Sequence, residues 1–201
     1  MATSSQAIRV IKLGGSLLDW PELSVRFRRW INLQTPAANV LIVGGGPLVE
    51  GLRTIDRAQR LSIEASHWLA IRAMSLTAQI VVELFKEAEL IRDLAQVARA
   101  PGGPLQVLDV GPVLQEEQAS SSALPFGWDV TSDSIAAHIA KRLVPSELVL
   151  LKSAIPQSAP SGDIPWADFV DAYFATAAHG LPVRLVNLRS REFDELAINA
   201  M

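Results

Sequence analysis

Two glycine-rich segments near the start of the chain could bind phosphate. Residues 12–16 have the sequence Lys-Leu-Gly-Gly-Ser, and residues 43–47 have the sequence Val-Gly-Gly-Gly-Pro. Each follows an apolar run that predicts a buried strand, and a helical pattern begins at Leu48. Glycine lets backbone amides approach an anion closely, and Lys12 adds positive charge beside the first pair. Either segment alone could be a tight turn, but together they predict two facing anion sites, as phosphoryl transfer requires.

The spacing of these glycines excludes two familiar nucleotide-binding patterns. Residues 12–16 do not match the Gly-x-x-x-x-Gly-Lys-Ser/Thr of the phosphate-binding loop. They do not match the Gly-x-Gly-x-x-Gly of dinucleotide-binding folds either. A nucleotide bound here would therefore be held by a different type of α/β fold.

Two further charged residues occupy positions where α/β proteins bind ligands. Asp133 lies in the run Thr-Ser-Asp-Ser before an apolar helical pattern, so Thr131 or Ser132 would cap that helix. Lys152 follows the apolar run 147–151, and ligands bind at the carboxyl ends of strands in open α/β sheets. Each has a structural alternative: Asp133 as a capping carboxylate, and Lys152 as a solvated strand end.

The elements that must position these residues alternate between strand and helix. Apolar runs predict buried strands at residues 8–13, 40–43, 105–110, 147–151 and 183–186. With helical patterns between most of them, the sequence predicts an α/β protein, a three-layer α/β/α sandwich with a mostly parallel central sheet.

Local composition predicts how the segments between these strands are built. No proline or glycine interrupts the helical pattern from residue 64 to about residue 100, which predicts one long helix or two in tandem. The run Pro-Gly-Gly-Pro at residues 101–104 ends it. Residues 115–124 are rich in Ser, Gln and Glu and predict an exposed loop.

Composition limits the class of protein. The chain has 201 residues, of which 49% are hydrophobic, and this suits one compact domain. Its net charge of −3 and the lack of a basic run argue against a nucleic-acid partner. There is no cysteine and there are three scattered histidines, which disfavours disulfides, thiolate sites and a histidine-rich metal centre. The polar first residues and the absence of an apolar run of about 18 residues predict no signal peptide and no membrane partner. We expect a cytoplasmic protein.

The two glycine-rich segments and the segments that contain Asp133 and Lys152 occur in the same order as motifs of the amino acid kinase family, which the chain resembles. This family includes acetylglutamate, aspartate, glutamate, uridylate and isopentenyl phosphate kinases. Residues 12–16 resemble the family's opening Lys-x-Gly-Gly motif, and residues 44–46 its substrate glycine loop. Residues 131–133 resemble its Asp-bearing segment, and residues 151–152 the strand that delivers its second lysine. The resemblance covers about residues 8–190. It implies one amino-acid-kinase domain over residues 1–201, with an acceptor lobe of about 1–145 and an abbreviated nucleotide lobe of about 146–201.

The resemblance also implies site residues and cofactors. Lys12 and Lys152 would neutralise charge on the transferring phosphoryl group, and Asp133 would organise both lysines. This suits a reaction whose transition state is loose and whose charge lies on nonbridging oxygens. ATP and Mg²⁺ would be required, with no protein metal ligand assigned. Gly14, Gly15, Ser16 and Lys152 would bind the nucleotide, and Gly44, Gly45, Gly46, His67 and Asp129 would bind the acceptor.

The acceptor is suggested by the segment that starts at His67, with the sequence His-Trp-Leu-Ala-Ile-Arg-Ala-Met. A lone histidine on an apolar helix face is usually a packed core residue. In the isopentenyl phosphate kinase branch, however, a histidine near this place contacts the accepting phosphate. The chain looks most like the small aminomethylfuran-methyl phosphate kinases of methanofuran biosynthesis. This implies a phosphate monoester acceptor in one-carbon cofactor biosynthesis. Two alternatives stay open: a nucleotide-binding storage or sensor protein of this fold, and a carboxylate (amino acid) kinase.

The chain departs from the family after Lys152. Family members commonly continue with an Asp-Val-Asp-Gly-type loop and a longer nucleotide lobe. Here residues 153–156 lead through Gly162 and Asp163 to a helix expected around residues 167–178, so the adenine pocket would be shortened. The family usually forms homodimers or larger assemblies, which makes the long helix from Glu64 a candidate homo-oligomer surface. Five tryptophans are expected to be core or interface anchors: Trp20, Trp30, Trp68, Trp128 and Trp166.

Overall fold

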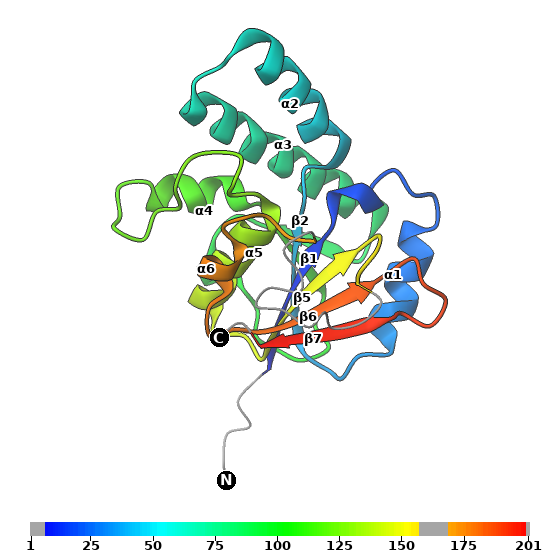
Figure 1. Cartoon of the computed structure of the whole chain (residues 1–201). Coiled ribbons are helices and arrows are strands. Elements are labelled where there is room, and N and C mark those ends of the chain that lie inside the picture. Colours follow the sequence, from blue (N-terminus) through cyan, green and yellow to red (C-terminus); the bar gives the residue numbers. More distant parts are fainter. Residues whose placement is uncertain (1–6, 157–168, 200–201) are drawn as a thin grey trace.

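A central sheet organises the protein, which is described here from a computed structural model over residues 7–156 and 169–199. Within these residues the sheet has seven strands in the order β3-β4-β2-β1-β5-β6-β7 (Figure 1). Neighbouring strands are parallel except for the β6–β7 pair, which confirms the mostly parallel sheet. The strands are β1 (Ile8–Leu13), β2 (Ala38–Val43), β3 (Ala88–Ile91), β4 (Leu105–Leu108), β5 (Glu147–Lys152), β6 (Pro182–Asn187) and β7 (Glu195–Asn199).

Helices cover both faces of this sheet. Alternate residues of a strand face opposite sides, so Val10 of β1 packs into one core cluster and Ile11 into the other. The first cluster packs against α4, α5 and α6, and the second against α1 and the last turns of α3. The α/β/α sandwich is confirmed. The helices are η1 (Gly15–Leu17), α1 (Leu23–Asn32), α2 (Gly46–Gln59), α3 (Ile63–Leu84), η2 (Leu94–Gln96), α4 (Val110–Glu117), α5 (Ser132–Leu143) and α6 (Phe174–Ala178).

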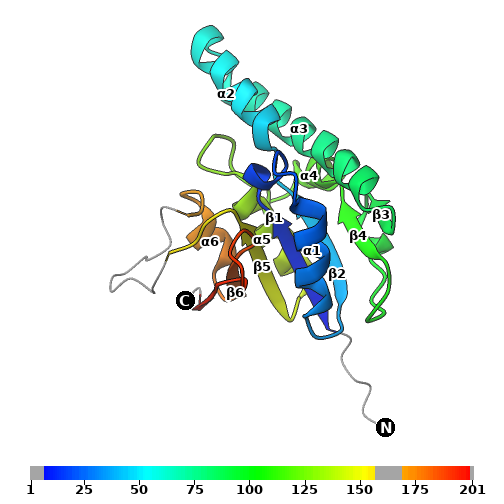
Figure 2. The same cartoon turned by 90° about the vertical axis from the view of Figure 1, so that its right-hand side faces the viewer.

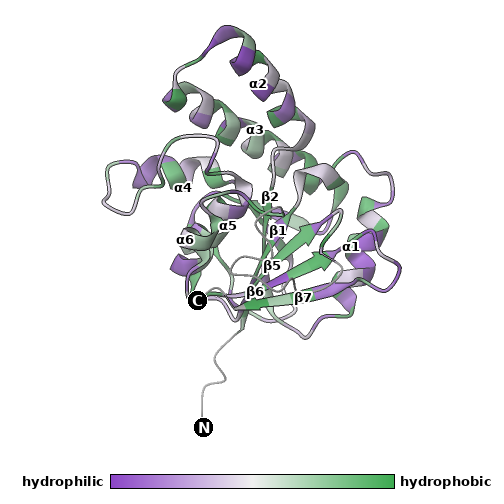
Figure 3. Ribbon diagram, in the orientation of Figure 1, coloured by the Kyte–Doolittle hydropathy of each residue, from purple (hydrophilic) through white to green (hydrophobic). Residues whose placement is uncertain are grey.

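Two helices extend beyond the body of the sandwich. Figures 1 and 2 show α2 and the first part of α3 as an antiparallel pair that projects from the carboxyl end of the sheet. Figure 3 shows hydrophobic residues in the central strands and hydrophilic residues gathered on α2. On α3, Leu69, Leu76, Ile80 and Leu84 are 38–48% exposed. The helix pair therefore forms one side of the space above the carboxyl ends of β1 and β2.

The expectation of helix from residue 64 to about residue 100 is wrong in its second half. α3 ends at Leu84, and Phe85 turns the chain with φ −113° and ψ 88° while its ring is fully buried. The chain then forms β3, whose residues pair with those of β4 from Ala88↔Leu105 to Ile91↔Leu108. The hydrogen bonds that stabilise β3 come from a distant segment, so helix-compatible composition could not reveal it.

Two other expectations need correction around α4. The strand predicted over residues 105–110 ends at Leu108, because the Asp109 carboxylate accepts a hydrogen bond from the Gly111 amide at 3.1 Å and begins α4. The loop predicted over residues 115–124 begins only after Glu117, which is still helical and buried. Glu117 contacts His138 of α5 at 2.6 Å, so a residue read as solvated is a packing contact between helices.

Part of the predicted nucleotide lobe lies outside the described residues. Gly162, Asp163 and Trp166 are in this part, as is the start of the helix expected around residues 167–178. In its described portion the expectation is wrong for residues 169–173, which are not helical, and the helix is only the short α6, Phe174–Ala178. Of the helices in the described residues, none is both long enough and apolar enough to cross a membrane.

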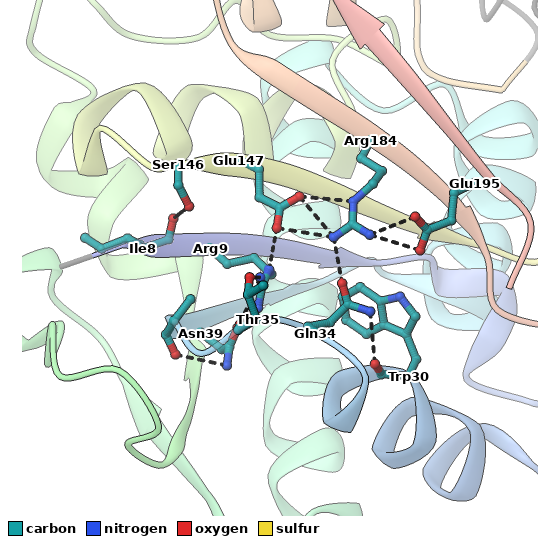
Figure 4. A network of polar contacts seen from close by, with 11 residues as sticks. Ile8, Arg9, Trp30, Gln34, Thr35, Asn39, Ser146, Glu147, Arg184 and Glu195 are labelled. Carbon is teal, nitrogen blue, oxygen red and sulfur yellow. Dashed lines mark hydrogen bonds and ion pairs between the residues drawn. The ribbon is translucent and has the colours of Figure 1, made fainter. Parts of the chain in front are cut away.

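A network of charged side chains joins the amino ends of the central strands (Figure 4). Arg9 of β1 is 3% exposed and donates to Glu147 of β5 at 2.6 Å and to Asn39 of β2 at 3.2 Å. Arg184 of β6 donates to the same Glu147 and to Glu195 of β7. A buried guanidinium is stable only when it is paired in this way. The network ties five strands together at the end of the sheet opposite to the glycine loops.

Candidate active site

Three charged side chains meet at the carboxyl ends of β1 and β5. Nζ of Lys12 lies 2.8 Å from Oδ1 of Asp133, and Nζ of Lys152 lies 2.6 Å from Oδ2. The three side chains are 5%, 7% and 13% exposed for Lys12, Asp133 and Lys152. The resemblance to the amino acid kinase family predicts these residues as one catalytic group, and the structure brings them together.

Strand register explains why both lysines reach one carboxylate. Lys12 of β1 pairs with Leu150 of β5, and Lys152 lies two positions further along the same strand. Alternate residues share a face, so both lysines point to the side covered by α5. Asp133 lies in the first turn of that helix, above the strand ends.

The cluster contains two basic side chains and only one acidic side chain. Burial alone would raise the pKa of Asp133, but the charges of Lys12 and Lys152 outweigh it, and that pKa lies below its usual value. Burial, and next the charge of Lys12, lower the pKa of Lys152 to about 8, against the opposing charges of Asp133 and Asp171. Two ammonium groups facing one carboxylate leave positive charge in a poorly solvated place, which favours an anion there.

The two glycine-rich loops lie directly against each other beside this cluster. A Cβ atom added at Gly15 would lie 2.3 Å from the Gly46 nitrogen, and one added at Gly44 would lie 2.9 Å from the Gly15 nitrogen. The backbone of Gly14 donates to the Leu151 carbonyl at 2.8 Å. Glycine is therefore needed for the close approach of the loops, and the juxtaposition predicted from sequence is present.

A cavity of about 480 Å³ opens between these loops and the helices above them. Ala70, Ile71 and Met74 of α3 and Ile135 of α5 supply apolar surface. The loop before α5 closes another side. The volume of the cavity lies in the range that is usual for small-molecule sites. The predicted site residues that line it are Gly15, Ser16, Gly45, Gly46 and His67.

His67 is both a packed residue and a cavity residue, so neither of its two sequence interpretations excludes the other. The side chain is 7% exposed, and its ring lies 5.2 Å from the Phe126 ring and 5.8 Å from the Trp68 ring. Burial lowers its pKa below the ordinary value, against a backbone hydrogen bond involving Gly127. At neutral pH the imidazole is thus uncharged and has a single N–H donor, which the backbone of Gly127 engages in the absence of a ligand.

Asp129 is placed differently from the other predicted acceptor residues. It is exposed and does not belong to the cavity lining. Its backbone carbonyl accepts a hydrogen bond from the Tyr173 amide at 3.1 Å. Its predicted role in acceptor binding stays a prediction.

The cavity wall contains a cation that sequence reasoning missed. The Arg53 guanidinium lies 4.1 Å from the centre of the Trp128 ring, and both residues line the cavity. The Trp128 indole donates to Asp56 at 2.7 Å, which lowers the pKa of that carboxyl. Trp128 was expected to be a core or interface anchor, but it forms a wall of the cavity. Arg53 lies about two turns after the glycine loop on α2, and this position near the loop was the signal that the sequence offered for it.

Asp171 is the second residue that sequence reasoning missed. Its carboxylate accepts hydrogen bonds from the backbone amides of Thr131 at 3.1 Å and Ser134 at 3.0 Å, and from both hydroxyl groups. Thr131 is the N-cap residue of α5, as predicted, but its side chain makes no capping bond among the described residues. Asp171 supplies the cap from another part of the chain.

Protein ligands for a metal are sparse in this region. Residues 7–156 and 169–199 contain no group of three His, Cys, Asp or Glu side chains that could hold a metal ion. A magnesium ion commonly keeps several waters and binds through substrate phosphates with one or two carboxylates. The donor set is thus compatible with Mg²⁺ that arrives on a nucleotide, and not with a dedicated metal cage in this part of the chain.

Comparison with known proteins gave sequence and structural similarities. No family model matches the chain. The (5-(aminomethyl)furan-3-yl)methyl phosphate kinase of Methanocaldococcus jannaschii is 26% identical over 145 residues, which are 71% of this chain and 64% of that enzyme. The chain therefore matches less than two thirds of the length of this curated relative.

Solved structures share the fold. Aspartate kinase from Synechocystis superposes with a TM-score of 0.66 at 13% identity, covering 95% of this chain and 40% of that one. A UMP kinase from Bacillus anthracis superposes with a TM-score of 0.63 at 12% identity, covering 96% of this chain and 99% of that one. At such identities the likeness concerns the fold.

Proposed function

We propose that this chain, which has the fold of the amino acid kinase family, transfers the terminal phosphoryl group of ATP to a small anionic acceptor. The observation that carries the proposal is the contact of Lys12 and Lys152 with Asp133 beside the two touching glycine loops. It combines cations for a highly charged transition state with amides that can hold two anionic groups. The sequence similarity to a phosphate kinase supports it.

The proposed reaction needs positioning and charge rather than a protein nucleophile. An oxygen of the acceptor forms a bond to the terminal phosphorus while the bond from that phosphorus to the bridging oxygen breaks, and ADP leaves with the electron pair. Lys12 and Lys152 would stabilise the nonbridging oxygens, where the negative charge resides. Asp133 would hold both ammonium groups in place. A phosphate acceptor is already ionised at neutral pH, so no general base is required.

The nucleotide would bind on the side of β5 and β6. Gly14, Gly15, Ser16 and Lys152 would contact its phosphates, with an abbreviated lobe of about residues 146–201 around the rest. The hydroxyl groups of Ser16 and Ser153 lie 3.0 Å apart and connect the two loops at this edge. Mg²⁺, when bound, would neutralise phosphate charge and be held mainly by phosphate oxygens.

For the acceptor we propose a phosphate monoester such as aminomethylfuran-methyl phosphate, the substrate in the name of the M. jannaschii relative. Gly44, Gly45 and Gly46 would bind its phosphate, and Asp129 would also contact the acceptor. The uncharged His67 would donate its one N–H to an oxygen of the same phosphate in place of its backbone contact with Gly127. The apolar residues of α3 suit a small ring. The diphosphate product would suit a later condensation that expels pyrophosphate, as in the biosynthesis of a one-carbon cofactor.

We also propose that the protein is a homo-oligomer in the cytoplasm. Four of the exposed apolar residues of α3 form a stripe along one side of that helix: Leu69, Leu76, Ile80 and Leu84. Such a stripe suits contact with a second copy of the chain.

The direct test is ADP release with Mg²⁺ and ATP across a panel of acceptors. The panel contains aminomethylfuran-methyl phosphate, isopentenyl phosphate, UMP, acetylglutamate, glutamate and aspartate. We expect turnover with the furan phosphate. Turnover with a carboxylate would replace it by an amino acid kinase activity. ATP binding without turnover on any acceptor would favour a storage or sensor protein of this fold.

A further inference from the structure

We propose that Asp171 is a positioning residue for phosphoryl transfer: it holds the first turn of α5 so that Asp133 meets both lysines. The inference rests on the function proposed above. It concerns a carboxylate outside the Lys12–Asp133–Lys152 cluster.

The contacts of Asp171 enclose Asp133 from both sides along the chain. Oδ2 of Asp171 accepts from the Thr131 amide at 3.1 Å, the Thr131 hydroxyl at 2.7 Å and the Ser134 amide at 3.0 Å. Oδ1 accepts from the Ser134 hydroxyl. Thr131 precedes Asp133 by two positions and Ser134 follows it directly. One carboxylate thus fixes the backbone on either side of the residue that binds both lysines.

This arrangement differs from an ordinary N-cap. A capping side chain usually belongs to the N-cap residue itself, so the helix and its cap form together. Here the cap comes from a segment that also binds the preceding loop, since the Tyr173 amide donates to the Asp129 carbonyl at 3.1 Å. Ser134 is fully buried, so its bond to Asp171 is shielded from water. The position of Asp133 therefore depends on docking of the segment that leads into α6.

Charge gives Asp171 a second effect. The charged groups that act on Lys152 are Lys12 from β1, Asp133 from α5 and Asp171. The two carboxylates favour the ammonium form, whereas burial and Lys12 oppose it, and the pKa of Lys152 is lowered to about 8. Loss of one carboxylate charge should lower the pKa of Lys152 further, toward neutral pH.

The test compares Asp171→Asn with Ser134→Ala in the full-length chain. Asp171→Asn keeps the shape of the side chain and removes its charge, while Ser134→Ala removes a hydrogen bond of Asp171 and keeps that charge. The first readout is the pH dependence of kcat/KM, which reports groups of the free enzyme. We expect the alkaline limb to move to lower pH by roughly half a unit or more in Asp171→Asn, and to stay in place in Ser134→Ala.

The second readout does not depend on activity. Competitive labelling with acetic anhydride at a series of pH values, followed by peptide mass spectrometry, titrates Lys152 directly, with the exposed Lys86 as internal reference. We expect the midpoint for Lys152 to fall in Asp171→Asn and to be unchanged in Ser134→Ala. If Asp171→Asn does not fold, Asp171→Glu keeps the charge on a longer side chain. It should lower kcat without moving the alkaline limb.

These readouts separate the inference from the function on which it rests. An unchanged Lys152 midpoint in Asp171→Asn would overturn the inference and leave Asp171 as a structural cap. Equal losses of kcat in Asp171→Asn and Ser134→Ala, with no difference in the pH profile, would do the same. If the wild-type protein turns over no acceptor, the proposed function fails, while the labelling experiment still decides whether Asp171 acts on Lys152.

Discussion

Nζ of Lys152 lies 2.6 Å from Oδ2 of Asp133, although one residue ends β5 and the other lies in the first turn of α5. The opposite oxygen of the same carboxylate faces Lys12 at 2.8 Å. A single buried carboxylate thus sets the separation of two cations at the carboxyl ends of neighbouring strands.

Replacing Asp133 by Asn should remove most activity. The two ammonium groups would lose their common counterion and repel each other, so they would no longer be held for the phosphoryl group. We expect kcat to fall by about 100-fold or more, and the free energy of unfolding to fall by about 3–5 kcal/mol because buried charges lose their partner. Steady-state kinetics and urea unfolding measure the two effects.

Glu117→Gln is the matched control for this variant. Glu117 is also a buried helical carboxylate, paired with Arg142 and in contact with His138, but it does not belong to the Lys12–Asp133–Lys152 cluster or to the cavity lining. It should lose stability and keep its kcat. A similar fall in kcat for both variants would show that the loss in Asp133→Asn reflects damage to the fold.

Activity should decline in mildly alkaline solution. The pKa of Lys152 is about 8, and the protonated form is the one that binds phosphate oxygens, so kcat/KM should fall about tenfold per pH unit above that value. The pKa of Asp133 is lowered, so this carboxylate stays ionised and imposes no acid limb near neutral pH. A pH series of kcat/KM at saturating Mg²⁺ tests this.

Lys152→Arg serves as the comparison, because a guanidinium stays protonated throughout this range. If that variant retains measurable turnover, its alkaline limb should disappear. Persistence of the limb in Lys152→Arg would assign it to another group.

Substitution of His67 should affect the acceptor rather than ATP. An uncharged imidazole that donates to a phosphate oxygen contributes about 1.5–3 kcal/mol, so His67→Ala should raise KM for the acceptor by about tenfold or more. KM for ATP should stay the same. His138→Ala, a histidine in the Glu117 contact on α5, should change neither constant. A fall in melting temperature without an acceptor effect would make His67 a packing residue.

A methyl group between the glycine loops should separate them. Gly15→Ala would place a Cβ atom 2.3 Å from the Gly46 nitrogen, where backbone cannot move aside easily. We expect loss of nucleotide binding, measured by isothermal titration calorimetry. Gly51→Ala is the control, because nothing lies within 4 Å of its Cβ position and alanine is the better helix former. It should stabilise the protein by about 0.5–1 kcal/mol and bind nucleotide normally.

A charge on the exposed stripe of α3 should change the size of the assembly. Leu76 and Ile80 are 48% and 42% exposed, and Ile80→Glu would place a carboxylate within the proposed contact between copies. Light scattering after size exclusion should show an oligomer for the wild type and a monomer for the variant. Val25→Glu, on α1 and 69% exposed, should keep the wild-type mass. A monomeric wild type would contradict the proposed surface.

Much of the candidate site could be predicted from the sequence because its parts are local. A strand that ends in Lys-x-Gly-Gly, a glycine triplet before a helix and a carboxylate in the first turn of a helix are each written in a few consecutive residues. Parallel strands bring such ends to one edge of the sheet, so the local motifs, together with the family resemblance, predict one region for Lys12, Gly45, Asp133 and Lys152.

The tertiary structure decided the features whose partners are distant in the chain. The composition of β3 predicts helix, and only its pairing with β4 makes it a strand. The sequence predicts Trp128 as a core or interface anchor, and only the folded chain places Arg53 over its ring. The two carboxylates at the start of α5 show the same division. Asp133 could be predicted because its own helix positions it, whereas Asp171 could not, because its four hydrogen bonds exist only when the segment before α6 docks on α5.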